Sequence, residues 1–384
     1  MRRFAAWTLV FTTTVAQTAT ANDTGFAAGF DPVWVLGYHV GYEADMYPTA
    51  AVDFAAMSHV IIGVVTPNAN GTVNTTYDID ATTGPVWAKG VADAAHAAGR
   101  EALLMIGGAG TVAGFEGAAS AANRAAFVTH LLQAMDAADA DGLDLDWEPL
   151  ASGDYANFTA LAQALRAARP ALLLTVPVGW VNSNFDNAAN PDPFYGTIAP
   201  LFDRIDIMSY DMEWPADGWV TWYTSALHGE GGNHPSSIDS SVDFYLASGV
   251  PRSKLGIGIG FYGVCWHGVT AALQTIGKNA GIYGSDNTYS YHNIVTSYYS
   301  AANHHYDAAS EMPYLANATA FGPTPGCNFL SYEDATSIAA KGAYVRRNGL
   351  AGTIIWNIGE GYVPEQAGQE NALLDAVGAA FLTP

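Results

Sequence analysis

The chain has 384 residues, half of them hydrophobic, and a formal net charge of −22 with only 14 lysines and arginines. This length is enough to bury a large core, either in one barrel domain or in a few smaller domains. Such a negative charge repels nucleic acid and anionic membranes, so we expect neither as a partner and favour a neutral or cationic partner.

The N-terminus has the pattern of a secretory signal. Arg2 and Arg3 precede a short apolar stretch, and residues 19–21 read Ala-Thr-Ala, a typical cleavage site. We therefore predict a signal peptide over residues 1–21 and a mature chain that begins near Asn22. The apolar stretch is too short to span a bilayer, and no later run of about 18 apolar residues appears. We expect a secreted, extracellular protein that is monomeric.

Short apolar runs bounded by Gly, Pro or Asp recur along the rest of the chain. Ala-rich stretches with helical spacing lie between several of them, for example over 118–138 and 155–168. Continuous apolar strands that alternate with helices indicate a parallel sheet covered on both faces, and eight such units predict an α/β protein with the (β/α)8 TIM barrel fold. A doubly wound sheet is the structural alternative. The predicted strands are 33–38, 59–65, 102–106, 142–147, 172–178, 205–208, 255–261 and 352–356.

One interval is far longer than a single crossover needs. Residues 262–350 are rich in Tyr, Gly, Asn and Ser, and they contain Cys265 and Cys327, the two cysteines of the chain. We predict a small α+β insertion subdomain here, between strands seven and eight, within a catalytic barrel domain over residues 22–384. In an exported protein the two cysteines are expected to form a disulfide that closes a long loop, and the alternative is two free thiols.

The octapeptide Asp-Gly-Leu-Asp-Leu-Asp-Trp-Glu at 141–148 carries the main chemical signal of the chain. Side chains alternate along a strand, so Asp144, Asp146 and Glu148 share one face while the apolar residues between them point the other way. Like charges so close cannot all ionise, so at least one pKa must rise, and a carboxyl with a raised pKa is a general acid near neutral pH. The alternatives are a calcium or magnesium site and a solvated acidic face, but calcium loops place their acids in Gly-rich turns.

Two other motifs could indicate a cofactor or a metal site, but neither is supported by the residues around it. Residues 108–113 approximate the dinucleotide fingerprint after a strand, but the next acid that closes a strand is Glu148, much further along than such sites require. The adjacent pair His304 and His305 has no ligand pattern around it. We therefore expect neither a metal nor another cofactor.

With the octapeptide on the fourth strand of a barrel, the chain resembles the family 18 glycoside hydrolases, and among them secreted chitinases. Asp141, Asp144, Asp146 and Glu148 match the D-x-x-D-x-D-x-E signature of that family. Four further motifs match in the same order: LMIGG at 104–108, MSYD at 208–211, FYG at 261–263 and IW at 355–356.

The resemblance implies a retaining hydrolysis of β-1,4 bonds between N-acetylglucosamine units of chitin or chito-oligosaccharides, with the acetamido group of the substrate as the nucleophile. Glu148 is then the general acid and base, and Asp146 orients the acetamido group. Asp144 shares a proton with Asp146, Tyr210 donates to the acetamido oxygen, and Asp211 binds sugar hydroxyls or supports the acid. For Asp141 we expect only a structural role at the start of the strand.

The same resemblance implies a groove that binds the sugar chain. Trp356 is expected to form its apolar floor, because a pyranose ring presents C–H groups to an aromatic face. The other candidates for substrate binding are Met208, Tyr38, Gly108, Trp214 and Tyr262, with Trp180 and Trp219 as further groove aromatics.

One position departs from the family pattern. Met105 stands where these enzymes usually have a serine that hydrogen-bonds the inner aspartates, and a thioether cannot donate a proton. We expect a shifted acidic limb of the pH profile rather than an inactive protein. Two other functions remain open on the same fold: a chitin-binding lectin without catalysis, and an endo-β-N-acetylglucosaminidase that acts on glycoproteins.

Overall fold

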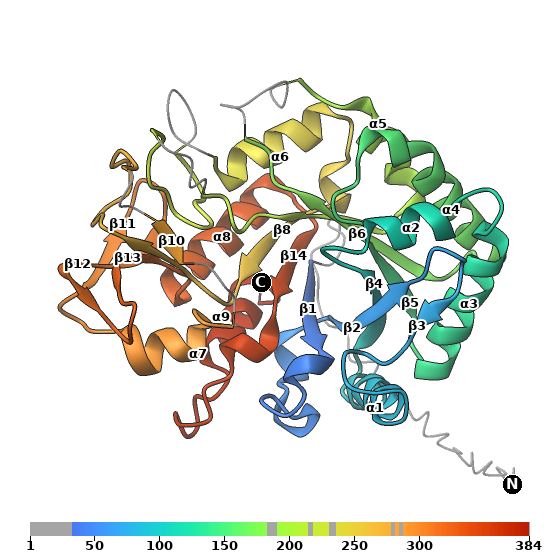
Figure 1. The fold of residues 1–384 in the computed structure, drawn as a ribbon, viewed down its shortest axis with the longest axis horizontal. Coiled ribbons are helices and arrows are strands. Elements are labelled where there is room, and N and C mark those ends of the chain that lie inside the picture. Colours follow the sequence, from blue (N-terminus) through green and yellow to red (C-terminus); the bar gives the residue numbers. More distant parts are fainter. Residues whose placement is uncertain are drawn as a thin grey trace, which may run out of the picture. The chain divides into compact units, whose positions relative to one another are not determined.

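A computed structural model describes residues 33–182, 190–213, 218–229, 236–277, 281–283 and 287–383. Parallel strands form a closed barrel within this part of the chain, because each strand pairs with its neighbour and β1 also pairs with β2 (Figure 1). The barrel strands are β1 (Trp34–Val40), β2 (His59–Pro67), β4 (Glu101–Gly107), β5 (Gly142–Asp146), β6 (Leu173–Gly179), β7 (Arg204–Met208), β8 (Leu255–Gly260) and β14 (Gly352–Trp356). The predicted TIM barrel is confirmed, and each predicted strand lies within about two residues of an observed one.

Helices cover the outside of the barrel (Figure 1). They are α1 (Thr83–Ala97), α2 (Val112–Ala118), α3 (Arg124–Ala138), α4 (Tyr155–Ala168), α5 (Pro193–Ile198), α6 (Ile238–Ala247), α8 (Ala335–Asn348) and α9 (Ala372–Phe381). No helix among the described residues is long and apolar enough to cross a membrane. The predicted signal peptide at residues 1–21 lies outside the described ranges.

The helix predicted over 118–138 begins later than expected. The structure divides this stretch between α2, which ends at Ala118, and α3, which begins at Arg124. The last turn of α2 is capped by side chains, since Ser120 Oγ and Asn123 Nδ2 both donate to the carbonyl of Gly117. Side chains that compete with the backbone for such carbonyls end helices. The alanine-rich composition of 118–138 gave no sign of the turn between α2 and α3.

Two apolar layers hold the barrel together. The alternate residues of each strand point either outward, against the helices, or inward, where Leu36, Ile61 and Leu103 form a separate buried cluster. Along β5, Leu143 and Leu145 belong to the outer layer, whereas the acids between them point inward. The inward face therefore changes from apolar to acidic towards the carboxyl ends of the strands.

A second sheet lies between β8 and β14 in the chain, and Figure 1 shows it in orange. It is antiparallel throughout, in the order β10-β9-β13-β12-β11, and α7 (Tyr291–Asn293) precedes its last three strands in the sequence. Its strands are β9 (Val264–His267), β10 (Gly281–Tyr283), β11 (His304–Asp307), β12 (Met312–Phe321) and β13 (Cys327–Ser331). The predicted insertion of strands and helices between barrel strands seven and eight is thus present, while the boundaries 262 and 350 stay a prediction.

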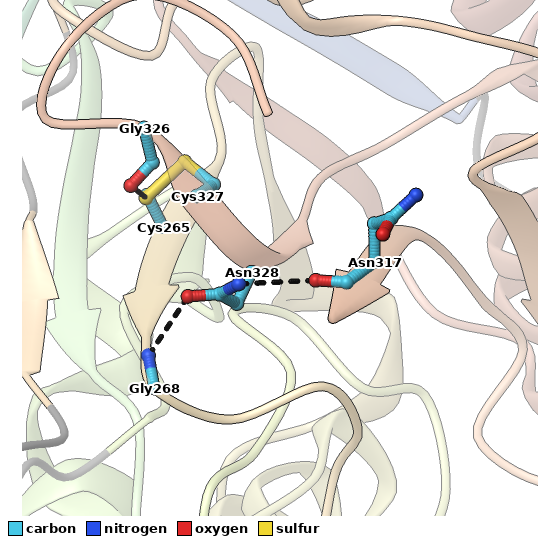
Figure 2. The surroundings of a disulfide bond; sticks show 6 residues. All are labelled: Cys265, Gly268, Asn317, Gly326, Cys327 and Asn328. Atoms are coloured by element: carbon cyan, nitrogen blue, oxygen red, sulfur yellow. Dashed lines mark hydrogen bonds between the residues drawn. A yellow bond between two sulfur atoms is a disulfide. The ribbon is translucent and has the colours of Figure 1, made fainter. Parts of the chain in front are cut away.

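The predicted disulfide joins two neighbouring strands of this second sheet. Cys265 on β9 is bonded to Cys327 on β13, with Cα atoms 5.5 Å apart and a sequence separation of 62. Beside it, Asn328 accepts a hydrogen bond from the backbone N–H of Gly268 and donates one to the carbonyl of Asn317 (Figure 2). The cross-link and this side chain together join β13 to β12 and to the chain around β9.

Candidate active site

A cavity of about 480 Å³ lies at the carboxyl ends of the barrel strands, where the sites of such barrels are built. Residues from β1, β4, β5, β7, β8 and β14, or directly after them, meet there. The cavity is lined by Tyr38, Met105, Ala109, Asp146, Glu148, Met208, Tyr210, Asp211, Glu213, Tyr262, Gly263, Val264 and Trp356.

The acids of β5 form a row that runs from the barrel interior into this cavity. Asp144 is the innermost, and both its oxygens accept hydrogen bonds: Tyr38 Oη donates over 2.7 Å and Thr175 Oγ1 over 2.5 Å. Asp146 is 2% exposed, and Oδ1 of its carboxyl has no hydrogen-bond partner among the described residues. Glu148 follows at the end of the row, within hydrogen-bonding reach of Asp146.

Burial raises the pKa of all three carboxyls. For Asp144 the donors Thr175 and Tyr38 oppose this effect, and its pKa rises only to about 6. For Asp146, burial acts together with the charges of Glu148 and Asp144, so its pKa lies well above the ordinary value. The pKa of Glu148 is also raised by burial, against a hydrogen bond from Asp146 that lowers it. Because the three groups interact, they titrate as a coupled set.

A second group of side chains follows β7 and β8. Tyr210 is 8% exposed and lies edge-on to Tyr262, with ring centroids 6.1 Å apart. Asp211 has φ 55°, a left-handed conformation, and its backbone N–H donates to Thr224 Oγ1. A hydrogen bond also joins the side chains of Tyr262 and Asp211. The predicted residues Tyr210, Asp211 and Tyr262 therefore face the same cavity as the β5 acids.

Apolar and aromatic groups form another part of the cavity wall. Trp356 ends β14, and its ring lies 5.3 Å from that of Tyr38. Met208 and Met105 add thioethers to this surface. The predicted residues Trp356, Tyr38 and Met208 are thus brought together around the acids.

Two predicted binding residues are placed differently from this group. Gly108 does not line the cavity. Its φ of 102° is left-handed and would strain any other residue, and a Cβ there would lie 2.9 Å from the movable methyl group of Met105. Trp214 lies outside the described residues. Of the further aromatics, Trp180 lines an adjoining cavity of about 600 Å³ that shares Glu148 and Met208 with the first, and Trp219 lines neither cavity.

Asp141 lies at the opposite end of β5. Its carboxylate accepts hydrogen bonds from the backbone N–H of Ala102 and from His96, far from the cavity lining. A structural role at the start of the strand remains our expectation for Asp141.

Sequence reasoning missed Glu213, which lines the cavity beside Asp211. It is 9% exposed, and burial together with the charge of Asp211 raises its pKa to about 8. The spacing of two residues from Asp211 was the available signal. Glu213 was missed because the MSYD motif ends at Asp211. No sequence pattern places the residues after that motif in the cavity.

No cluster of three or more His, Cys, Asp or Glu side chains that could hold a metal ion occurs in the described part of the chain. The side chains that line the cavity supply carboxyl, phenol and aromatic groups, which can transfer protons, form hydrogen bonds and stack on a ligand.

Comparisons with known proteins identify relatives of this chain. Chitotriosidase-1 of Mus musculus is 31% identical over 277 residues, which cover 66% of this chain and 57% of that protein. A probable endochitinase of Caenorhabditis elegans is 30% identical over 275 residues, or 64% of this chain and 41% of that protein. This chain thus matches only about half the length of these relatives.

Among solved structures, the Ostrinia furnacalis Group IV chitinase in complex with allosamidin superimposes with a TM-score of 0.74. The match covers 90% of this chain and 98% of that one, at 22% identity, and at that identity it supports the fold alone. The model of the glycosyl hydrolases family 18 matches residues 35–361, which include every barrel strand but the first residue of β1. The chain therefore belongs to glycosyl hydrolase family 18.

Proposed function

We propose that the protein is a chitinase, which hydrolyses β-1,4 bonds between N-acetylglucosamine units. The observation that carries this proposal is the position of Glu148, whose carboxyl has a raised pKa and lies in a cavity bounded by Asp146, Tyr210 and Trp356. The names of the matched relatives, a chitotriosidase and an endochitinase, support the same class of substrate.

Glu148 acts first as the general acid in this proposal. Its proton passes to the glycosidic oxygen as the bond to the anomeric carbon breaks, and the carbonyl oxygen of the substrate's acetamido group forms the new bond to that carbon. Water then attacks the resulting oxazolinium ion while Glu148 takes back a proton. Two displacements at one carbon retain its configuration.

Asp146 and Tyr210 position the acetamido group for this attack. The carboxylate of Asp146 accepts a hydrogen bond from the amide N–H and stabilises the positive charge of the oxazolinium ion, and Tyr210 Oη donates to the amide oxygen. Asp144 lies behind Asp146 and holds the shared proton when Asp146 ionises. The two hydrogen bonds to Asp144 favour its charged form, so the shared proton lies on Asp146 at rest and moves to Asp144 only when positive charge develops beside Asp146.

The walls of the cavity bind the sugar. The indole of Trp356 packs under the ring at the cleaved bond, where C–H groups meet its face. Met208 and Tyr38 extend this apolar surface, and Asp211 with Tyr262 presents oxygen atoms to the sugar hydroxyls. At the level of the whole protein, we propose an exported monomer whose signal peptide is residues 1–21.

Time-resolved NMR of N-acetylglucosamine oligomers treated with the protein tests this function. The expected result is turnover in which the β-anomer appears first and then mutarotates. Initial release of the α-anomer would contradict the acetamido mechanism. Binding without turnover would favour a lectin, and cleavage confined to high-mannose glycoprotein would favour an endo-β-N-acetylglucosaminidase.

A further inference from the structure

Lys341 on α8 carries a charge in the protein interior that the proposed reaction does not use. Its side chain is 0% exposed, and that of its ionic partner Glu333 is 1% exposed. Burial lowers the pKa of Lys341, while the adjacent carboxyl of Glu333 favours the charged form. A buried ion pair adds little net stability, because both charges lose their hydration. Its hydrogen bonds therefore indicate more about its role than its charge does.

The ammonium group of Lys341 fixes the direction of a hydrogen bond at Ser225. It donates to a carboxyl oxygen of Glu333, to Ser225 Oγ at 2.9 Å and to the thioether of Met312 at 3.7 Å. An ammonium group can only donate, so the hydroxyl of Ser225 must accept from it. The proton of that hydroxyl then points to the carbonyl oxygen of Ser209, which is 2.6 Å away.

Ser209 immediately precedes Tyr210 in the chain and is held on its other side by β8. Its hydroxyl accepts from the backbone N–H of Gly258 at 2.8 Å and donates to the carbonyl of Gly258 at 3.0 Å. The backbone pairing of β7 with β8 ends before Ser209, so this side chain continues the contact between the two strands. Ser209 is fully buried and is thus fixed between β8 and Ser225.

The ring of Tyr210 lies against the same glycine of β8. A Cβ atom at Gly258 would lie 2.8 Å from Cε1 of Tyr210 and 2.8 Å from the backbone nitrogen of Ser209. The side chain of Tyr210 and the backbone before it are therefore both in close contact with β8. A shift of Ser209 moves the phenol that lines the cavity.

Thr224 and Ser225 form a brace that holds the chain on both sides of Tyr210. On one side, Ser225 donates to the carbonyl that precedes Tyr210. On the other side, the backbone N–H groups of residues 211 and 212 donate to Oγ1 and to the carbonyl of Thr224, at 3.2 and 2.9 Å. Lys341 anchors this brace to α8.

We propose that Lys341 is a positioning residue for Tyr210, which it holds through Ser225 and Ser209. The inference rests on the proposed function, in which the hydroxyl of Tyr210 donates to the acetamido oxygen of the substrate. A small displacement of such a donor weakens binding of the transition state more than binding of the substrate. Loss of the contact should therefore lower kcat and leave KM nearly unchanged.

A double-mutant cycle on kcat tests this route. Ser225→Ala removes the hydroxyl between Lys341 and Ser209, and we expect kcat to fall about tenfold, which corresponds to one hydrogen bond. In Tyr210→Phe no hydroxyl is left to position, so the same substitution should change kcat by less than about twofold. Equal losses in both backgrounds, or no loss in either, would refute the positioning role.

The pair variant, Lys341→Met with Glu333→Gln, tests where the effect begins. It removes both charges together, so that no unpaired charge is left in the interior. We expect the kcat of Ser225→Ala, and no further loss when that change is added, because the ammonium group acts through that hydroxyl. Full activity of the pair variant, or additive losses, would refute the role of Lys341.

Ser248→Ala is the matched control for the loss of a buried hydroxyl. Ser248 is 5% exposed, and its hydroxyl donates to the carbonyl of Phe244 in α6. It has no contact with the brace, so its kcat should equal that of the wild type. A loss as large as that of Ser225→Ala would show that any buried hydroxyl has this effect, and it would overturn the proposal.

Hydrogen exchange followed by mass spectrometry gives a readout that needs no turnover. The N–H groups of residues 211 and 212 are bonded to Thr224, so a loosened brace should raise their exchange rates about tenfold in Ser225→Ala and in the pair variant. Peptides from β4 and β5 should exchange as in the wild type, which distinguishes a local change from a general loss of stability. Unchanged exchange at residues 211 and 212 would overturn the proposal.

These results separate the inference from the function on which it rests. If the wild type cleaves N-acetylglucosamine oligomers and Ser225→Ala matches its kcat, the inference fails and the chitinase proposal stands. If the wild type cleaves no oligomer, the chitinase proposal fails, and the exchange measurement still decides whether Lys341 holds the chain around Tyr210. Circular dichroism shows whether the pair variant is folded, and the cycle with Ser225→Ala does not depend on it.

Discussion

The buried carboxyl of Asp144 is controlled by side chains from two other strands. Tyr38 comes from β1 and Thr175 from β6, and each donates to one oxygen of Asp144. These donors keep the pKa of Asp144 at about 6 despite its burial. In the proposed mechanism, activity at acidic pH is lost when both aspartates become protonated, so these contacts set the acidic limb.

Replacing Tyr38 with Phe should move the acidic limb of kcat/KM to higher pH. The change removes a donor that favours ionised Asp144, so its pKa rises, and the expected shift is about one pH unit. Tyr262→Phe is the matched control, because that phenol interacts with Asp211 rather than with Asp144. A limb that stays in place in Tyr38→Phe would contradict the assignment.

Replacing Met105 with Ser should shift the same limb in the opposite direction. Met105 lies beside Asp146, since its methyl group and Oδ2 of Asp146 both approach the open side of Gly108. Position 105 pairs with Asp144 across β4 and β5 and faces the barrel interior, so a serine hydroxyl there can donate to an inner aspartate, which lowers the pKa of that aspartate and extends activity to lower pH. Met105→Ala removes the same bulk without adding a donor, and its limb should not move. Identical pH profiles of kcat/KM for Met105→Ser and Met105→Ala would contradict this prediction.

Much of this site could be predicted from local pattern. The alternation along 141–148 placed Asp144 and Asp146 on one face, because a strand has a period of two residues. Thr175 and Glu213 could not be predicted in this way. Thr175 acts through the alignment of β6 with β5, and Glu213 through the path of the chain after β7, and neither leaves a local signal.

At the scale of elements, continuous apolar runs made the barrel strands predictable to within about two residues. Parallel strands covered on both faces need apolar side chains at nearly every position, and this signal is hard to mistake. The short turn between α2 and α3 and the register of the antiparallel sheet were not predictable. Both depend on hydrogen bonds between residues that share no sequence pattern.

Helix α8, which leads back to the last barrel strand, offers a test of element stability. Its N-cap Asp334 accepts from the backbone N–H groups of Thr336 and Ser337, and Ser337 Oγ accepts in return from the N–H of Asp334. Asp334→Ala should lower the free energy of unfolding by about 1 kcal/mol, measured by urea denaturation. Asp334→Asn keeps the cap while removing the carboxylate that lies 3.5 Å from His304 Nε2, and it should remain close to the wild type. Equal losses in both variants would assign the effect to charge.

At the scale of the whole molecule, the free energy of unfolding depends on pH through buried carboxyl groups that are neutral in the folded state. Asp206 on β7 is 1% exposed, and its Oδ1 has no partner among the described residues. Burial raises its pKa to about 8, although the charge of Arg204 acts against this. Between an unfolded pKa near 3.8 and this folded value, the folded state holds a proton that the unfolded state has lost. The contribution of Asp206 to stability therefore falls as pH rises through this window.

Asp206→Asn should remove that dependence, because an amide resembles the neutral acid and does not ionise. The variant should match the wild type at the acidic end of the window and become more stable than it by about 1 kcal/mol per pH unit as pH rises. Denaturant unfolding across the window provides the measurement. A difference that does not vary with pH would show that Asp206 is ionised in the folded protein.

The central claim is that Glu148 delivers the proton that breaks the bond, and Glu148→Gln tests it most directly. Turnover of N-acetylglucosamine oligomers and their calorimetric affinity are measured on the same variant. The account predicts that kcat falls by at least about a thousandfold, since the site loses its general acid, while affinity changes little because its shape is kept. Turnover by Glu148→Gln near the wild-type rate would contradict the account and assign the acid to another residue.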